Sequence, residues 1–284
     1  MPEPSVYFIG AGPGDPDLIT VKGQRIIQRA DVIIYADSLV HPGICADVRP
    51  DAEIHGSSTL PLEQILDLIV TAAKAGKTVA RIQSGDPSLY GAIHEQMVAL
   101  DREGITYQIV PGVSSAFAAA AALGTEMTVP NVAQTVIFTR VGGRTGLPGN
   151  ERLAEFARHR VTMALFLSIA MIDRVVDELM EGGYPAETPV AVVHRVTWED
   201  ESVLRCTLAT LAAEVRAAKL AKQALIMVGP VFDPALHQEA GDNRSHLYDA
   251  TYTHMFRKGT WRRSGPVAPT IPAIAGEAVE AVSE

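Results

Sequence analysis

The stretch Val6-Tyr7-Phe8-Ile9-Gly10-Ala11-Gly12-Pro13-Gly14-Asp15 joins an apolar run to a loop that contains three glycines. The apolar run is typical of a buried β-strand, and an amphipathic helix pattern follows at residues 17–29. The same order recurs twice, with apolar runs at residues 78–82 and 108–110, loops at residues 84–91 and 111–115, and helix patterns after them. This alternation predicts an α/β fold with a largely parallel first sheet. Because ligands bind beyond the carboxyl ends of parallel strands, the three loops predict a small-molecule pocket.

A second group of strand patterns follows a stretch around Pro130 that has no clear element. The strand patterns lie at residues 135–141, 162–167, 188–196, 201–208 and 224–228, with helix patterns at residues 150–158, 169–182 and 209–219. A short polar turn joins the third and fourth strands, which predicts antiparallel pairing and therefore a mixed second sheet. We expect three parts: an α/β domain over residues 1–128, a second α/β domain over residues 129–236, and an extension over residues 237–284. The extension is rich in Pro, Ala and Glu near its end, so we expect disorder from about residue 265.

Composition narrows the functional class. The chain has 284 residues, 24 Lys and Arg against 33 Asp and Glu, and a net charge of −9, which argues against nucleic-acid binding and against a membrane-surface protein. Cys45 and Cys206 form no disulfide framework and no metal spacing, so we expect free thiols and no metal site. No long apolar segment and no leader pattern is present, and we expect a cytoplasmic protein.

The first loop also invites a dinucleotide-binding interpretation. The dinucleotide fingerprint needs a third glycine where this chain has Asp15, and Pro13 lacks an N–H group that a pyrophosphate would use. A nicotinamide-dependent oxidoreductase therefore remains only an alternative. Taken singly, each loop also fits an ordinary strand-to-helix turn, with Ser114 and Ser115 as helix caps.

Seven segments, in order along the chain, resemble the tetrapyrrole (corrin/porphyrin) methylases. They are residues 6–23 (VYFIGAGPGDPDLITVKG), 30–40 (ADVIIYADSLV), 81–91 (RIQSGDPSLYG), 110–124 (VPGVSSAFAAAAALG), 162–168 (TMALFLS), 189–201 (PVAVVHRVTWEDE) and 225–231 (LIMVGPV). The resemblance implies methyl transfer from S-adenosylmethionine, two α/β domains with the cofactor in the cleft between them, and a homodimer.

The resemblance also implies site residues. Cofactor contacts are expected from Pro13, Ser84, Gly85, Asp86, Ser114, Ser115, Met163, Phe166, Val192, His194 and Met227. A substrate with many carboxylates calls for cationic side chains on loops. The candidates are Arg81, His94, Arg140, Arg144 and Arg195. We predict no catalytic residue, because a methyl sulfonium is already activated and the protein mainly positions the reactants.

Two segments indicate a branch of the family. Residues 194–201 (HRVTWEDE) and 247–257 (LYDATYTHMFR) resemble the branch that methylates a corrin precursor, precorrin-4, at C11 in cobalamin biosynthesis. Methylation at another ring position, or of the cobalt-containing counterpart, remains open. The scaffold also resembles an RNA methylase and a diphthine-forming enzyme, and the negative charge disfavours the RNA substrate. A tetrapyrrole carrier without methyl transfer is a further alternative.

Overall fold

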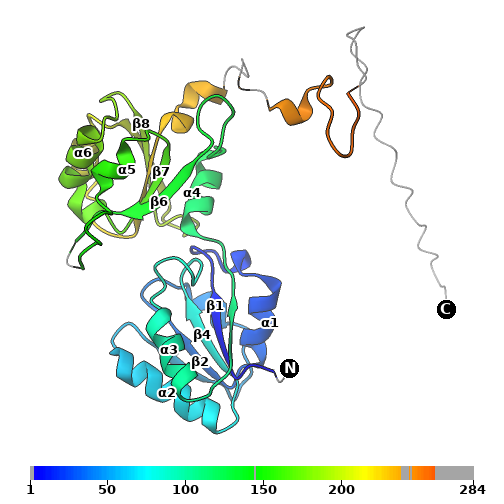
Figure 1. Cartoon of the computed structure of the whole chain (residues 1–284). Coiled ribbons are helices and arrows are strands. Elements are labelled where there is room, and N and C mark those ends of the chain that lie inside the picture. Colours follow the sequence, from blue (N-terminus) through cyan, green and yellow to red (C-terminus); the bar gives the residue numbers. More distant parts are fainter. Residues whose placement is uncertain (1–2, 144, 238–242, 244, 260–284) are drawn as a thin grey trace, which may run out of the picture. The chain divides into compact units, whose positions relative to one another are not determined.

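The computed structural model describes residues 3–143, 145–237, 243 and 245–259. The chain divides into two compact units, residues 1–243 and 244–284 (Figure 1). The first unit holds both β-sheets. In the second unit, a short 3-10 helix spans His246–Tyr248, and an isolated antiparallel bridge pairs His254 with Arg257.

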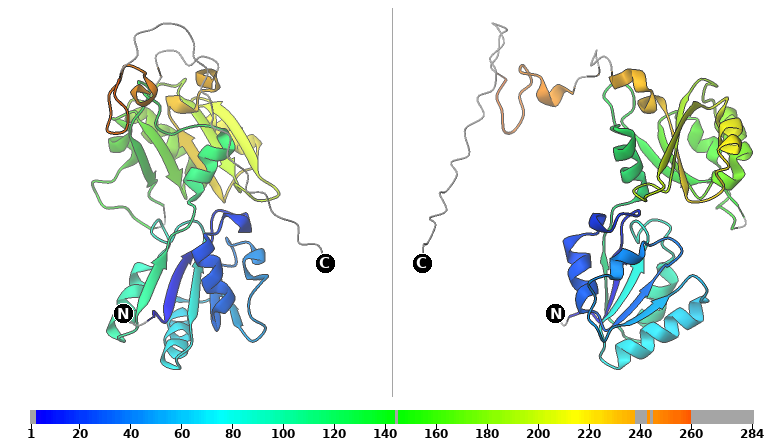
Figure 2. Two further views of the ribbon diagram at one scale, coloured as in Figure 1. Left: turned by 90° about the vertical axis from the view of Figure 1, so that its right-hand side faces the viewer. Right: turned by 180° about the vertical axis from the view of Figure 1, so that it is seen from behind.

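The first sheet is entirely parallel, in the order β3-β2-β4-β1-β5. Its strands are β1 (Val6–Gly10), β2 (Val32–Tyr35), β3 (Glu53–Gly56), β4 (Val79–Gln83) and β5 (Tyr107–Val110). Helix α1 (Val21–Arg29) covers one face, and α2 (Leu62–Lys74) and α3 (His94–Arg102) cover the other (Figure 2). With both faces covered, β1 and β4 are buried along their whole length, which explains the continuous apolar run of β1, whereas β4 also buries Arg81 and Gln83.

Helix α1 begins later than its sequence pattern predicts. Thr20 is its N-cap, and the Thr20 hydroxyl accepts a hydrogen bond from the Gly23 amide. The preceding residues form a separate 3-10 turn, Pro16–Leu18, in which the Asp15 side chain accepts from the Asp17 amide at 2.9 Å. The loop after β1 is therefore closed by its own cap before the helix starts.

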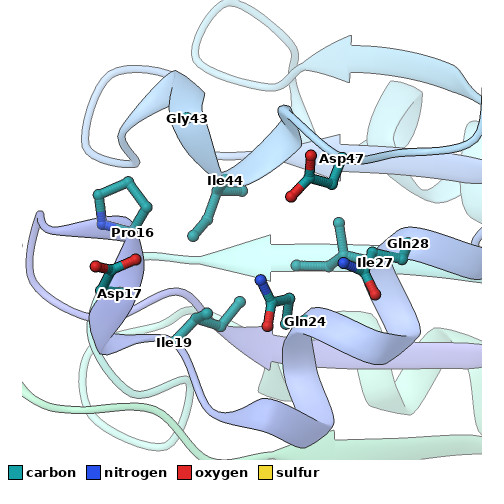
Figure 3. A pocket seen from close by; sticks show the side chains of 9 residues that line it. All are labelled: Pro16, Asp17, Ile19, Gln24, Ile27, Gln28, Gly43, Ile44 and Asp47. Carbon is teal, nitrogen blue, oxygen red and sulfur yellow. The ribbon is translucent and has the colours of Figure 1, made fainter. Parts of the chain in front are cut away.

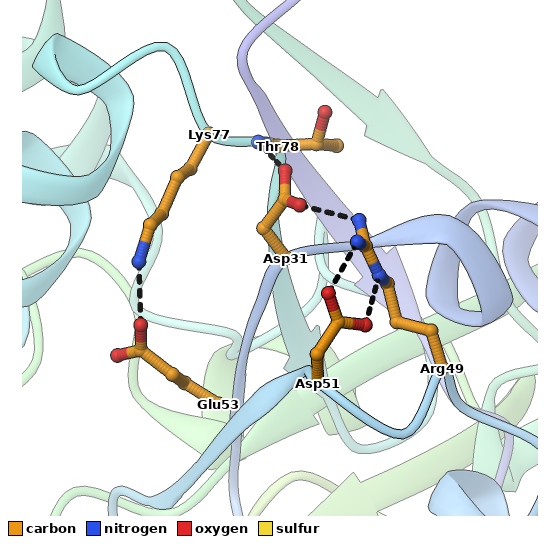
Figure 4. Close-up of polar contacts among 6 residues, drawn as sticks. All are labelled: Asp31, Arg49, Asp51, Glu53, Lys77 and Thr78. Carbon is orange, nitrogen blue, oxygen red and sulfur yellow. Dashed lines mark hydrogen bonds and ion pairs between the residues drawn. The ribbon is translucent and has the colours of Figure 1, made fainter.

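Polar contacts fasten the amino-terminal edge of the first sheet, opposite the glycine loops. Asp31 accepts from the Thr78 amide at 2.7 Å and from Arg49 at 2.5 Å, and Arg49 also pairs with both oxygens of Asp51 (Figure 4). Arg49 and Asp51 are well exposed, so the ion pair itself adds little free energy. The partly buried hydrogen bond between Asp31 and the Thr78 amide ties the entry to β2 to the entry to β4.

The second sheet is mixed, in the order β6-β7-β10-β8-β9. Its strands are β6 (Val136–Arg140), β7 (Thr162–Phe166), β8 (Pro189–His194), β9 (Ser202–Thr207) and β10 (Ala224–Val228). Only β6 and β7 are parallel. Helices α5 (Leu153–Ala157), α6 (Ile172–Glu181) and α7 (Leu211–Ala217) pack on one face, and α4 (Ser115–Leu123) packs on the other.

The predicted fold class is confirmed: the first sheet is parallel and the second is mixed. Strand β3 has no clear sequence pattern, because it is a four-residue edge strand with exposed side chains. Helix α4, which we had grouped with the first domain, packs on the second sheet. The boundary at residues 128 and 129 stays a prediction. The tail beyond residue 259, including the predicted disorder, lies outside the described residues. In the part that the structure describes, no helix is long and apolar enough to span a membrane.

Candidate functional site

A cavity of about 600 Å³ opens at the carboxyl edge of the first sheet. The loops after β2 and β4 and the start of α4 form one wall. The opposite wall comes from the ends of β7 and β8 and from the segment that enters β10. This volume is ordinary for a site that encloses an organic cofactor or a substrate of similar size. The cavity lies where the three glycine loops predict a pocket.

The glycines of these loops allow main chains to cross at close range. A Cβ atom built on Gly112 would lie 2.7 Å from the Gly10 Cα and closer still to the Gly85 carbonyl oxygen. Gly12 and Gly85 pair as an antiparallel bridge. We expected the glycines mainly to let a ligand approach the backbone. Gly85 does line the cavity, whereas Gly10 and Gly112 have no side chain because neighbouring main chain occupies that space.

Asp86 fixes the loop after β4. One of its oxygens accepts from the Gly112 amide at 2.9 Å, and the other accepts from the Ser88 amide at 2.8 Å and from the Ser88 hydroxyl. Desolvation raises the pKa of Asp86, but the hydrogen bonds from Ser88 and Gly112 outweigh it and hold the pKa below its ordinary value. Asp86 is therefore a charged brace between two loops.

Asp86→Asn tests this role through pH. Because the folded-state pKa is depressed, the stabilisation is present above the unfolded pKa, near 3.8, and is lost as the pH falls through the folded value. At pH 7 we expect the variant to lose about 1 kcal/mol of unfolding free energy, the difference between a charged and a neutral acceptor. Urea titrations of both proteins from pH 7 to pH 3 should show this gap closing below about pH 4. A gap that is constant across that range would contradict the brace.

Trp198, in the turn between β8 and β9 of the second sheet, contacts the first glycine loop. Its Nε1 donates to the Pro13 carbonyl at 3.0 Å, and its ring lies 5.2 Å from that of His41. Beside it, the Thr197 hydroxyl accepts from the Asp15 amide at 2.9 Å. A Cβ atom on Gly14 would lie 2.5 Å from Nε1 of Trp198, so the missing side chain at Gly14 makes room for the indole. We call these contacts the Trp198 clamp.

Arg195 supports the same clamp from the cavity wall. Its guanidinium pairs with Asp200 at 2.6 Å, donates to the Gln223 side chain at 3.0 Å, and lies 4.2 Å from the centroid of the Trp198 ring. These contacts orient Arg195 at the cavity, although they also engage much of its donor capacity.

Some of the strained backbone of the described chain lies at the cavity. Four non-glycine residues that line it have positive φ angles: Tyr90 at 57°, Leu167 at 53°, Arg195 at 47° and Gln223 at 52°. Such conformations cost free energy and persist where the surroundings enforce them. Tyr90 and Leu167 present large side chains that are 44% and 67% exposed, and the Tyr90 ring lies 5.3 Å from that of Phe166. The cavity thus combines an apolar, aromatic wall with a few polar groups.

Comparison with known protein families identifies the family of this chain. The model of the family described as "Tetrapyrrole (Corrin/Porphyrin) Methylases" matches residues 5–212. The chain belongs to the tetrapyrrole methylase family. Similar curated proteins include the cobalt-precorrin-4 C(11)-methyltransferase of Priestia megaterium, 48% identical over 89% of this chain and 98% of that protein. The precorrin-4 C(11)-methyltransferase of Pseudomonas aeruginosa is 47% identical over 90% of this chain and 99% of that protein.

Solved structures agree with the family. A cobalt-precorrin-4 methyltransferase of cobalamin biosynthesis, 48% identical, matches 81% of this chain and 96% of its own with a TM-score of 0.79. A uroporphyrin-III C-methyltransferase from Thermus thermophilus, complexed with S-adenosyl homocysteine, is 28% identical and matches 80% of this chain and 97% of its own with a TM-score of 0.67. The expectation of a tetrapyrrole methylase is confirmed, and the chain is a methyltransferase.

The structure of this tetrapyrrole methylase brings most predicted cofactor residues to the cavity. Those that line it are Pro13, Ser84, Gly85, Asp86, Ser114, Ser115 and Phe166. Met163, Val192 and Met227 are fully buried in the core around the second sheet and do not line the cavity. His194 ends β8 next to the cavity residue Arg195 and does not itself line the cavity.

The predicted substrate residues are more scattered. Arg195 lines the cavity, whereas Arg81 is 5% exposed and turned inward. His94 is exposed at the first position of α3, and Arg140 donates to the carbonyls of Thr145 and Gly146 in the next loop. The structure does not bring His94 or Arg140 to the cavity, and Arg144 lies outside the described residues.

The sequence did not predict that Tyr90, Leu167 and Gln223 line the cavity. Their positive φ angles are not signalled by any sequence pattern. A second hollow, of about 120 Å³, lies between α1 and the 3-10 helix Pro42–Cys45 (Figure 3). Its apolar side chains, among them Ile27 and Ile44, face one another across a space too small for a cofactor. No cluster of three metal-ligating side chains occurs among the residues that the structure describes.

Proposed function

We propose that the chain is an S-adenosylmethionine-dependent C-methyltransferase that converts precorrin-4, or its cobalt-containing form, to the C11-methylated product in cobalamin biosynthesis. The observation that carries this proposal is the cavity, which lies on the predicted cofactor loops and is lined by Gly85, Ser114 and Phe166. Two curated relatives that match nearly their full length are C11-methyltransferases, which supports the ring position. The relative named for the cobalt-containing substrate and the relative named for precorrin-4 are about equally similar to this chain. The proposal therefore includes both forms of the substrate, with and without cobalt.

The residues present fit such a cofactor. Glycine loops expose main-chain donors and acceptors, Asp86 and the Ser114 hydroxyl are polar, and Val193 and Leu225 offer an apolar surface to a nucleoside. When bound, S-adenosylmethionine supplies an activated methyl group. The protein then has to orient the acceptor carbon and exclude water.

Each side chain has a definite part in that task. Asp86 is engaged by Gly112 and Ser88, so it shapes the loop rather than removing a proton. Tyr90, Leu167 and Phe166 form an apolar wall suited to a macrocycle face. Arg195, at the rim of the clamp, is placed to meet a substrate carboxylate.

The direct test is mass spectrometry of reactions with enzymatically prepared precorrin-4 and with its cobalt form, each with S-adenosylmethionine. We expect a gain of one methyl group, which isotope-labelled NMR should place at C11. Absence of methyl transfer from either substrate, with S-adenosylhomocysteine still bound, would overturn the substrate assignment. Failure to bind S-adenosylhomocysteine would overturn the cofactor assignment.

We further propose that the enzyme is a cytoplasmic homodimer, as the family resemblance implies. Phe117 and Ile109 are 55% and 40% exposed, and exposed apolar side chains of this size suit an interface. Sedimentation equilibrium should give twice the chain mass, and a monomer at micromolar concentration would contradict the dimer.

A further inference from the structure

Gln83 lines the cavity and has a polar group without a partner. It is the last residue of β4, is 7% exposed, and has an Nε2 that is enclosed and makes no hydrogen bond to any described residue. Leaving a buried amide donor unpaired costs free energy, whereas a leucine of similar size would carry no such cost. A half turn of the terminal amide exchanges its NH₂ group and its oxygen at constant shape, and Nε2, which is enclosed as placed, would meet a ligand only after such a turn.

Arg81 lies two residues earlier on the same face of β4, about 7 Å away along the strand. Its guanidinium is buried and donates to neutral acceptors: the side chains of Gln96 and Ser57, and the carbonyls of Ile34 and Ile82. No carboxylate among the described residues pairs with it. Desolvation lowers the pKa of Arg81 to about 10, and the group remains a cation at neutral pH.

Arg81 itself does not line the cavity, and the charged side chains that do are already engaged or exposed. Asp86 is held by Gly112 and Ser88, Arg195 pairs with Asp200, and Lys222 is exposed. An unpaired donor at Gln83, with an uncompensated buried cation behind it, makes this end of the cavity complementary to an anion. The unpaired donor raises the free energy of the empty site, and a carboxylate that accepts from it would relieve that cost within the field of the Arg81 charge.

We propose that Gln83 donates a hydrogen bond from Nε2 to a ligand carboxylate at this end of the cavity, and that the charge of Arg81 strengthens the interaction from behind. This inference rests on the proposed function. Two ligands of that reaction carry carboxylates: the amino-acid end of S-adenosylmethionine and the acidic side chains of the tetrapyrrole. The experiment separates them.

The test compares Gln83→Leu with the wild type in three measurements. They are the Kd of S-adenosylhomocysteine, the Kd of its analogue without the carboxylate, and the KM and kcat for precorrin-4. Losing a hydrogen bond to a charged group should weaken the affected ligand about tenfold or more. Gln64→Leu, an exposed position on α2, is the matched control and should change none of the three.

The pattern of losses identifies the source. Weaker S-adenosylhomocysteine binding with an unchanged decarboxylated analogue assigns the cofactor carboxylate. A raised KM for precorrin-4 with kcat and cofactor affinity unchanged assigns a substrate carboxylate. Unchanged values in all three measurements would overturn the inference while leaving the proposed function intact, and a wild type that neither binds the cofactor analogue nor transfers a methyl group would overturn the proposed function itself.

The melting temperature adds a second readout. If Gln83 had a purely structural role, its replacement should lower the melting temperature. Without ligand, Gln83→Leu should melt at the same temperature as the wild type or higher, because the variant removes an unpaired buried donor. Gln83→Glu should also fold, since its carboxylate would lie within the field of the Arg81 charge, and it should repel a carboxylate ligand more strongly than the leucine variant does. If either variant bound carboxylate ligands as well as the wild type, the proposed hydrogen bond would be wrong.

Discussion

Gly112→Ala is expected to destabilise the protein by about 3 kcal/mol or more, at the upper end of the usual cost of overpacking. The added methyl group would meet the Gly10 Cα at 2.7 Å and the Gly85 carbonyl oxygen at a shorter distance. Both neighbours are main chain, so no side-chain rotation relieves the overlap. For a chain of this size the melting temperature should fall by roughly 6–12 °C, measured by calorimetry without ligand.

Gly149→Ala is the matched control for that measurement. Nothing lies within 4 Å of a Cβ atom at Gly149, and its φ angle is not in the left-handed region. We expect its melting temperature to equal that of the wild type. If Gly112→Ala melted with the control, the close crossing of the three glycine loops would not exist in solution.

Trp198→Ala should reduce both stability and methyl transfer. The variant loses the hydrogen bond to the Pro13 carbonyl, the ring contact with His41 and the surface on which Arg195 rests. Trp198 is half-buried, so we expect a loss of about 2–3 kcal/mol, less than for a fully buried tryptophan. Because the first glycine loop loses its anchor beside the cavity, kcat/KM should fall at least tenfold.

Trp198→Phe separates the ring from the hydrogen bond. The phenyl ring retains part of the contact with His41 and Arg195 but cannot donate to Pro13. It should recover part of the lost stability and less of the lost activity. Equal activity of the alanine variant and the wild type in a methyl-transfer assay would show that the clamp has no part in positioning the reactants.

Local sequence patterns were sufficient to predict strands β1, β4 and β5 of the first sheet and the position of the pocket. Apolar runs such as that in β1 are long enough to signal burial on both faces, and parallel strands place the following loops at one edge. Edge strand β3 was not predicted, because it is short and its side chains are mostly exposed. The family resemblance, rather than periodicity, supplied the predicted cofactor residues.

The clamp and the strained residues could not be predicted locally. Trp198 binds a carbonyl 185 positions away, and no neighbouring residue announces that partner. Alternation along β4 predicts the face of the sheet on which Arg81 lies, but not how deeply its side chain is buried. The sequence therefore did not distinguish a buried arginine from one at the edge of a loop. Met163 and Met227 are similar cases, since α5, α6 and α7 bury Met163 on one face of the second sheet and α4 buries Met227 on the other.

Each sheet is built from one uninterrupted length of chain: residues 6–110 supply every strand of the first, and residues 136–228 supply every strand of the second. On the ribosome, the amino-terminal sheet can therefore pair all its strands before the carboxyl-terminal sheet has emerged, because domains fold as they emerge. The first glycine loop lacks its hydrogen bond from Trp198 until that residue, which is translated much later, has emerged. The nascent enzyme can therefore fold its first sheet well before it can complete the cavity.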